Sequence, residues 1–555
     1  MKTDLPIATL PLAAVATAWL LPNHAYPWIS AWQEGLALAL LLVAGLLGRD
    51  SGRLPTPWLA ALGLALASVA WQWGTGRILF HGDALMVVMY LAAFGLAVAL
   101  GSSLVVKEPD GRTPALDWLA VGILAGAIAS VGMALSQWTQ TYVIHFTVSV
   151  DLKPGARPYA NFSQANHFCT AAFLGLCSLI FLHEARRIGR TAFWLGAAYL
   201  LLGMVMSGSR TGWLQVGVAV GLALMLQRRI KPRLTVRPLL ALASVYVLLT
   251  LAWPAANEIL LLSAGRGVGD QLQGGVRLPL WLSLLDAVGR APLWGYGWQQ
   301  VAIAQQTVAL DHPAVMHLFE HSHNLVLDLL LWAGVPVGGT IALLVAAALV
   351  LQWRALRDAR ALWLMAAALG VLVHSMLEYP IEYAYFLLPT GLCLGAAHGL
   401  CPSAWSLAVR PAQLRGVALI LSVLTAVVAV DYLKAEQNHR LLRLESVGIG
   451  AQSGAPELLV LDQLQAFLWF ARNPARPDMP LDERERMRLA ALRWPFPPLL
   501  LRQALIAGLH GDVAGAERQL ALVCSLHSHE RCEEGRESWQ QLQTRYPQLK
   551  AVRLP

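Results

Sequence analysis

Residues 83–101 read DALMVVMYLAAFGLAVALG and contain one charged side chain, Asp83, at the first position. An apolar helix of roughly 17–25 residues is long enough to cross the hydrocarbon core of a bilayer. Similar stretches recur along the chain, whose residues are 57% hydrophobic and only 13% charged. Ordinary soluble domains carry about 25% charged residues. The sequence therefore predicts an all-α polytopic membrane protein.

Thirteen apolar segments, separated by charged or turn-forming clusters, are found along the chain. Lys2 and the apolar run that follows it to Leu21 resemble a signal peptide. Because many further spans follow directly, we interpret this run as an uncleaved first span. We predict about thirteen transmembrane helices, near residues 7–21, 35–47, 57–72, 83–101, 116–137, 167–182, 191–206, 212–226, 238–252, 335–351, 361–375, 383–398 and 416–432.

The cysteine pattern argues against a disulfide scaffold and against a zinc finger. Six cysteines in 555 residues make no disulfide framework, and no CxxC or zinc-finger spacing occurs. Four of the six lie in or beside apolar segments: Cys169, Cys177, Cys393 and Cys401.

Lysines and arginines are distributed unevenly between the two sides of the predicted membrane. If the N-terminus is cytoplasmic, the inside loops hold 17 positive charges and the outside loops hold seven. The inside residues are Arg49, Arg53, Lys107, Arg112, Arg186, Arg187, Arg190, Arg228, Arg229, Lys231, Arg233, Arg237, Arg354, Arg357, Arg360, Arg410 and Arg415. The outside residues are Arg77, Lys153, Arg157, Arg210, Arg266, Arg277 and Arg290. This bias fixes the orientation, so the net charge of +8 is mostly a topology signal and we predict no nucleic-acid partner.

The orientation divides the chain into four predicted parts. They are N-terminal transmembrane helices over 1–252, a large outer loop over 253–334, C-terminal transmembrane helices over 335–432, and a small helical outer tail over 433–555. The chain resembles a bacterial protein, so we expect the membrane to be the inner membrane and the outer side to be the periplasm. No ATP is available there, so chemistry on that face requires a pre-activated substrate.

Four polar clusters are predicted where the spans meet the outer face. They are Asn161–His167, Ser207–Arg210, Glu320–Asn324 and Glu378–Pro380. Polar groups at membrane depth are costly unless they are paired. Their repeated appearance on one face therefore indicates a shared site.

The sequence of these clusters resembles a known family. Asn-Phe-Ser-Gln-Ala-Asn-His at 161–167, Gly-Ser-Arg-Thr-Gly-Trp at 208–213 and His-Ser-His-Asn at 321–324 are similar to motifs of the O-antigen ligase/polymerase superfamily. The early segment Pro-Asn-His-Ala-Tyr-Pro-Trp at 22–28, Gln164, and Glu-Tyr-Pro at 378–380 resemble its bacterial protein O-oligosaccharyltransferase branch (PglL/PilO type). The resemblance covers roughly residues 1–432, and the tail resembles the C-terminal extension of that branch.

The resemblance implies transfer of an oligosaccharide from undecaprenyl diphosphate to Ser or Thr hydroxyls of periplasmic proteins or pilins. The implied partners are the lipid-linked oligosaccharide, an acceptor protein and membrane lipid, and no cofactor is implied. Two alternatives within the superfamily are an O-antigen ligase acting on the lipid A core and a polysaccharide polymerase. A flippase or transporter is the alternative from another class, but it predicts charges deep within helices and internal repeats, and we find no clear repeat.

By the family match, His323 corresponds to the essential histidine, and His321 is the second candidate. Neutral imidazoles can accept a proton at physiological pH, and a hydroxyl nucleophile needs that help. A metal site formed by His317, Glu320, His321 and His323 is an alternative, since positions 317 and 321 would share a helix face. The paired-histidine metalloprotease motif is absent, and the resemblance implies transfer without a metal.

Arginines are the candidates for binding the donor's diphosphate. A guanidinium makes paired hydrogen bonds to phosphate oxygens and stabilises the charge that grows on the leaving diphosphate. Arg210 and Arg277 are the first choices, whereas Arg266 and Arg290 fit a headgroup contact or a structural salt bridge better. The candidates for sugar or acceptor contacts are Gln164, Asn324, Glu378 and Tyr379, although tyrosines are also common at membrane interfaces.

The tail contains two predicted amphipathic helices, Pro498–Ala507 and Ala514–Cys524, which resemble one tetratricopeptide-type hairpin. Cys524 and Cys532 are the only cysteines of the tail. Because the outer compartment permits disulfides, we predict a bond between them.

Overall fold

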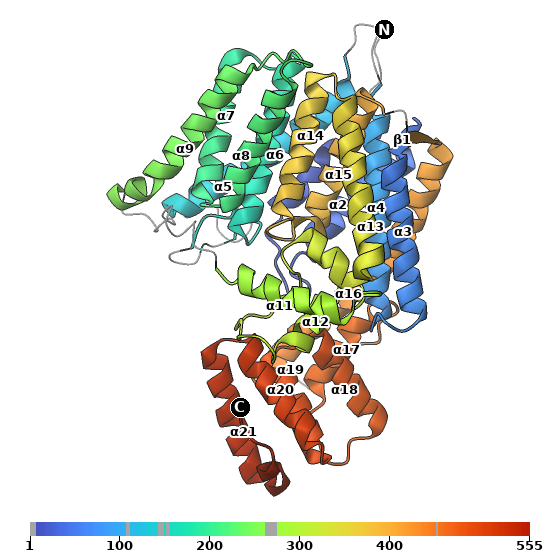
Figure 1. Cartoon of the computed structure of the whole chain (residues 1–555), viewed down its shortest axis with the longest axis vertical. Helices are drawn as coiled ribbons and strands as arrows, with labels where there is room; N and C mark the ends of the chain where they lie inside the picture. Colours follow the sequence, from blue (N-terminus) through green and yellow to red (C-terminus); the bar gives the residue numbers. More distant parts are fainter. Residues whose placement is uncertain are drawn as a thin grey trace. The chain divides into compact units, whose positions relative to one another are not determined.

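The computed structural model describes residues 7–106, 112–141, 149–150, 152, 156–260, 275–403, 405–450 and 453–555. These residues are mostly helical (Figure 1), and their two short strands form one antiparallel pair. Strand β1 (Gly52–Pro55) pairs with β2 (Ser406–Val409) so that Gly52 lies opposite Val409. The predicted all-α class is confirmed.

Each of the thirteen predicted apolar segments falls on helical structure. In chain order these elements are α1 (Thr9–Ala13) with η1 (Ala14–Leu20), α2 (Ala31–Leu47), α3 (Thr56–Gly74), α4 (His81–Ser103), α5 (Pro114–Thr139), α6 (Ala165–Glu184), α7 (Arg190–Met206), α8 (Arg210–Leu226), α9 (Val236–Ile259), α13 (Leu325–Ala355), α14 (Ala359–His374), α15 (Ala384–Leu400) and α16 (Pro411–Glu445). Six of them are long and apolar enough to cross a membrane, namely α4, α5, α6, α9, α13 and α16. The chain is therefore a polytopic membrane protein, and the number of thirteen spans stays a prediction.

The chain divides into two compact units. Unit 1 comprises Met1–Leu62, Tyr90–Gln273 and Leu344–Thr425. Unit 2 comprises Gly63–Met89, Gly274–Leu343 and Ala426–Pro555. The predicted boundary at residues 334/335 coincides with a break in α13 at Gly334, whereas the one at 432/433 lies inside α16.

Helices of unit 1 approach one another closely because glycines lie at their contacts. A Cβ atom added to Gly395 of α15 would lie 1.9 Å from the carbonyl oxygen of Val98 in α4. One added to Gly122 of α5 would lie 1.7 Å from the carbonyl oxygen of Ala13. Helices in lipid associate through such small residues because packing, rather than the hydrophobic effect, drives their contact.

In unit 2, α13 is broken at Gly334, which has a φ of +76°, and Pro336 follows two residues later. The break frees two carbonyl oxygens, which accept hydrogen bonds from a neighbouring segment. The N–H of Tyr296 donates to the oxygen of Leu331 at 2.7 Å, and that of Gly297 donates to the oxygen of Trp332 at 3.1 Å. The part of α13 before the break starts at Leu325, ten residues before the predicted span. This part belongs to the predicted outer loop.

Apart from the short η3 (Pro380–Glu382) of unit 1, the remaining helices of the described residues belong to unit 2. They are α11 (Arg277–Arg290), α12 (Val301–Val308), α17 (Asp462–Arg472), α18 (Leu481–Arg493), α19 (Pro497–Leu509), α20 (Val513–Leu526), α21 (His529–Arg545) and η4 (Pro547–Ala551). The two predicted tail helices lie within α19 and α20, which pack side by side (Figure 1). Asp512 caps α20 by accepting from the N–H of Gly515 at 2.9 Å. The predicted helical tail and its Cys524–Cys532 disulfide are confirmed, whereas the side of the membrane on which the tail lies stays a prediction.

We expect Gly395→Ala to destabilise unit 1, because its new methyl group overlaps a backbone oxygen. Overpacking of this kind costs about 1–3 kcal/mol, so the thermal unfolding midpoint in detergent should fall. Gly217→Ala is the matched control, since an added Cβ there has nothing within 4 Å and alanine is a better helix former than glycine. Equal midpoints for Gly395→Ala and the unmodified protein would contradict the close-contact explanation.

Candidate functional site

The histidine loop, Glu320–Asn324, ends at the N-terminus of α13. Asn324 caps this helix, because its side-chain oxygen accepts from the N–H groups of Val326 and Leu327 at 3.1 Å each. A side-chain oxygen at this position satisfies donors that have no partner within the helix. The structure thus gives Asn324 a role in shaping the loop, and its predicted sugar contact stays a prediction.

Ser322, at the centre of the loop, is fully buried and held by three different groups. Its N–H donates to the carboxylate of Asp328 at 2.7 Å, and its hydroxyl donates to the carbonyl of Asn324 at 2.9 Å. The indole N–H of Trp281, on α11, donates to the carbonyl of Ser322 at 2.8 Å. These bonds fix the backbone that carries the two histidines on either side.

The two candidate histidines lie in different surroundings. His321 is buried, and burial, reinforced by the nearby charges of His323 and Arg493, lowers its pKa to about 3. His323 is half-buried, and its ring lies edge-on to that of Phe319 at a centroid distance of 5.2 Å. His321 is therefore neutral at physiological pH, while His323 is the more accessible of the two.

His323 has a φ of +59°, in the left-handed region that is uncommon for residues other than glycine. Residues held in such conformations persist where the surrounding structure imposes them, and they cluster at functional sites. Here the bonds to Ser322 and the cap at Asn324 impose it. The sequence motif gives no indication of this strained backbone conformation.

Arg493, on α18, is a charged neighbour of the histidine loop that sequence reasoning missed. Its guanidinium pairs with both carboxylate oxygens of Asp83 at 2.8 and 3.3 Å. Asp462 of the tail also accepts from the N–H groups of His81 and Gly82 at 3.0 and 2.8 Å, at the start of α4. Arg493 of the tail thus contributes charge near His321, and Asp462 joins the tail to the start of α4.

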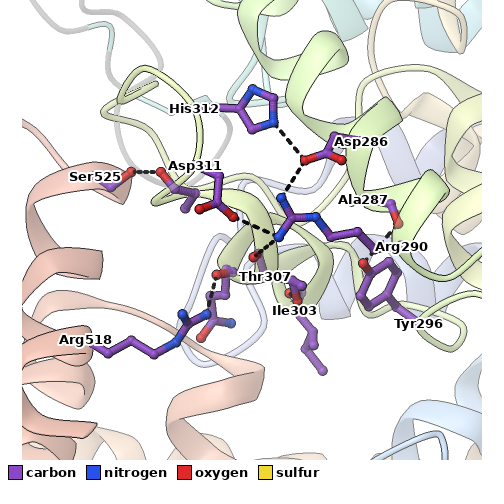
Figure 2. Close-up of polar contacts among 12 residues, drawn as sticks. Asp286, Ala287, Arg290, Tyr296, Ile303, Thr307, Asp311, His312, Arg518 and Ser525 are labelled. Atoms are coloured by element: carbon purple, nitrogen blue, oxygen red, sulfur yellow. Dashed lines mark hydrogen bonds and ion pairs between the residues drawn. The ribbon is translucent and has the colours of Figure 1, made fainter. Parts of the chain in front are cut away.

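The arginine candidates of unit 2 differ in their partners. Arg277 is the first residue of α11 and is half-buried. Arg290, at the other end of α11, pairs with Asp286 at 2.7 Å and with Asp311 at 2.8 Å (Figure 2). Arg290 therefore forms the structural salt bridge that the sequence suggested for it. Arg266, like Lys107 and Lys153, lies outside the described residues.

In unit 1, the structure brings together Gln164 and Glu378, which are predicted site residues 214 positions apart. The buried carboxylate of Glu378 accepts from the side-chain amide of Gln164 at 3.3 Å and from that of Asn166 at 3.0 Å. Paired amide donors compensate the cost of burying a charge. Asn166 was not a predicted site residue, but it could have been predicted because it belongs to the same sequence motif as Gln164.

The residues that follow Asn166 and Glu378 in the chain, His167 and Tyr379, belong to one group of aromatic rings. His167, which is buried, lies edge-on to Tyr379 at 6.2 Å and to Tyr383 at 5.0 Å. Tyr379 lies beside Tyr383 with a centroid distance of 5.9 Å. Tyr379 is therefore part of an aromatic group with His167 and Tyr383. His167 lies in the predicted polar cluster Asn161–His167, but neither it nor Tyr383 was a predicted site residue.

Arg210 is the first residue of α8 and is half-buried. The hydroxyl of Ser209 caps this helix by accepting from the N–H of Thr211 at 3.2 Å. The preceding turn is held by Arg157, whose guanidinium donates to the carbonyls of Ser207 and Gly208 at 2.9 and 3.0 Å. Arg157, counted at first only as an outside charge, thus orders the turn that presents Arg210.

The segment 22–34 is anchored in unit 1 by buried polar groups. Glu34 accepts from the indole N–H of Trp28 at 3.0 Å and from the backbone N–H of Ala384 at 3.1 Å, and it also bonds Ser30 and Tyr90. A ring nitrogen of His24 bonds the carbonyl of Asn161 at 2.7 Å. The two family-like segments, 22–28 and 161–167, are thus in direct contact.

His317, Glu320, His321 and His323 are the residues of the alternative metal site. Over the described part of the chain, no three or more His, Cys, Asp or Glu side chains are grouped as metal ligands would be. The four residues of this alternative are all described, and they form no such group.

Two family models match the chain, one after the other. The model described as O-antigen ligase matches residues 195–338, and the model described as virulence factor membrane-bound polymerase, C-terminal, matches residues 362–542. The first match includes Arg210, Arg277 and the histidine loop. The second includes Glu378 and most of the helical tail.

Two characterised proteins from Acinetobacter baylyi are similar to the chain. A general O-oligosaccharyltransferase is 29% identical over 538 residues, covering 92% of this chain and 91% of the relative. A ComP-specific O-oligosaccharyltransferase is 27% identical over 322 residues, covering 58% of this chain and 57% of the relative. By these matches, the chain is similar to the O-antigen ligase/polymerase superfamily and, within it, to the bacterial protein O-oligosaccharyltransferases.

Proposed function

We propose that the chain transfers an oligosaccharide from undecaprenyl diphosphate to Ser or Thr hydroxyls of periplasmic or pilin-type proteins, at the periplasmic face of the bacterial inner membrane. Similarity to a general O-oligosaccharyltransferase over 92% of the chain supports the kind of reaction. The observation that carries the proposed chemistry is the fixed histidine loop, in which the half-buried His323 is held at a positive φ.

In the proposed reaction, His323 takes the proton of the acceptor hydroxyl. The hydroxyl oxygen then forms a bond to the anomeric carbon of the first sugar, and the bond from that carbon to the diphosphate oxygen breaks with inversion. Undecaprenyl diphosphate leaves with the electron pair of the broken bond. His321 is unsuited to accept this proton, because burial lowers its pKa to about 3.

We assign diphosphate binding to Arg210 and Arg277. Each is half-buried at the first position of a helix, α8 or α11. At this position the helix N-terminus also favours a negative charge. A guanidinium bonded to the leaving diphosphate stabilises the charge that develops on it during transfer. No metal ion is required by this scheme.

We assign sugar or acceptor contacts to Gln164, Glu378 and Tyr379. Amide, carboxylate and phenol groups match the hydroxyls of a glycan, because each can donate or accept hydrogen bonds. Tyrosine rings also offer apolar faces to a sugar ring. The contact between Gln164 and Glu378 supports a common role for these two residues.

A second candidate function is transfer of the glycan to another glycan or to the lipid A core. The descriptions of the two matching family models, O-antigen ligase and membrane-bound polymerase, favour considering it. To distinguish the two functions, the purified protein is reconstituted with a lipid-linked oligosaccharide and offered a pilin-like protein and lipid A core at the same concentration. We expect it to glycosylate the pilin-like protein and not the lipid A core. Mass spectrometry of both acceptors measures the outcome, and transfer to lipid A core alone would contradict the proposed acceptor class.

We expect His323→Ala to lower transfer at least about 100-fold, the usual contribution of general base catalysis. Expression and membrane insertion should be unchanged, as judged by size-exclusion chromatography in detergent. The control is His529→Ala, because His529 is exposed on the tail. Normal transfer by a well-folded His323→Ala protein, with loss only in His321→Ala, would identify His321 as the general base.

We expect Arg210→Lys to lower transfer roughly ten- to hundredfold. Lysine keeps the charge but cannot form the paired hydrogen bonds of a guanidinium, and a charged hydrogen bond contributes about 1.5–3 kcal/mol. The Michaelis constant for the lipid-linked donor, measured at saturating acceptor, should rise. Arg190→Lys is the matched control, since Arg190 is the exposed first residue of α7. Identical kinetics for the two variants would show that Arg210 has a structural role.

A further inference from the structure

Helix α11 carries an apolar face on its outer side. Leu278, Leu282 and Leu285, spaced four and three residues apart, are 61%, 58% and 52% exposed. On the opposite side, Leu280, Leu284 and Ala287 are fully buried in unit 2: their exposed fraction is 0%. A helix on the surface of a soluble protein has polar residues on its outer face. This helix instead has apolar residues on both faces, so its outer face is more stable in an apolar environment than in water.

Two charged residues of α11, Asp286 and Arg290, lie along one flank, between these two faces. Asp286 and Arg290, one turn apart, form a salt bridge, and Asp286 also pairs with His312 at 2.9 Å (Figure 2). These bonds hold the pKa of the Asp286 carboxyl below its usual range. Asp286 and Arg290 are thus bound within unit 2, away from the outer face of Leu278, Leu282 and Leu285. This arrangement is typical of helices that lie in a membrane interface.

The apolar surface of α11 continues onto the segment that follows it. Leu293 and Trp294 are exposed, and the ring of Trp294 lies 4.4 Å from that of Trp71 on α3. Trp71 and Trp73 are exposed as well, and the guanidinium of Arg77 lies over the ring of Trp71 at 5.5 Å. Tryptophans of this kind, with an arginine beside them, are enriched at the boundary between membrane and water.

The same surface also continues onto α13. The N–H of Val335 donates to the carbonyl of Pro292 at 2.7 Å, so the segment after α11 lies against the start of the second half of α13. Along that half, Val335 and Leu343 are exposed, and the whole helix is long and apolar enough to span a membrane. The segment that follows α11 thus contacts, within unit 2, a helix that is long and apolar enough to span a membrane.

We propose that α11 is an interfacial helix, lying at the boundary of headgroups and acyl chains, with Leu278, Leu282, Leu285 and Leu293 among the lipid chains. Bilayer lipid is the occupant of this face, because the exposed tryptophans mark the membrane surface beside it. Through the bond from Trp281 to Ser322, the same helix holds the histidine loop at a fixed position relative to the lipid.

Site-directed fluorescence quenching in lipid nanodiscs tests this proposal in the full-length protein. Leu282→Cys is labelled with bimane, and the quenching by nitroxide-labelled phosphatidylcholine is compared with that by aqueous iodide. Leu343→Cys, on the apolar surface of α13, is the lipid-facing control, and Ser538→Cys, exposed on α21, is the water-facing control. The four free cysteines are buried, and the unmodified protein measures their background labelling.

We expect the lipid nitroxide to quench Leu282→Cys about as strongly as Leu343→Cys, and iodide to quench it several-fold less than Ser538→Cys. Labels at Leu278→Cys and Leu285→Cys should agree, which guards against one variant that fails to fold. Strong iodide quenching without lipid quenching would place the face in water and overturn the proposal. Quenching by neither reagent, as a protein partner or a second copy of the chain would produce, would overturn it too.

Discussion

The break in α13 at Gly334 determines how the surroundings of the histidine loop are arranged in unit 2. An interrupted helix leaves carbonyl oxygens without partners, and such groups are costly in an apolar environment. Here the N–H groups of Tyr296 and Gly297, and the side chain of Gln72, supply the missing donors. Because a Cβ on Gly334 would lie 2.4 Å from the carbonyl oxygen of Leu293, the contact also requires glycine. The first part of α13, with Asn324 as its cap, is thus fixed against the segment that follows α11.

Buried hydrogen bonds then distinguish the two histidines of the loop. Ser322 is bonded by Asp328, Asn324 and Trp281, which come from α13, its cap and α11. A backbone fixed in this way directs His321 inward, where its pKa is low, and leaves His323 more accessible. Groups that must meet a substrate need such fixed positions, since small displacements cost much of the rate. The neutral His321 and the strained His323 are consequences of the same few bonds.

Unit 1 uses buried polar groups in a similar way, to join segments that are far apart in the sequence. Glu34 links the early segment 22–34 to the start of α15, and Glu378 links the end of α14 to Gln164 and Asn166. Each carboxylate is buried and bonded by several donors, which is the arrangement that makes a buried charge tolerable. Polar clusters at the helix ends therefore define both the connections of the unit and the groups proposed for glycan binding.

The sequence by itself determined where the helices are, because long apolar runs in a membrane protein have few other stable structures. It also determined the polar motifs, the helical hairpin of α19 and α20, and the pair Cys524–Cys532, since each depends on residues close together in the chain. The tertiary structure decided which of His321 and His323 is buried, that Arg290 is bound by Asp286 and Asp311, and that Trp281 and Arg493 lie near the loop. It alone revealed the exposed leucines of α11. These properties arise from contacts between residues far apart in the chain, and local patterns of polarity do not contain that information.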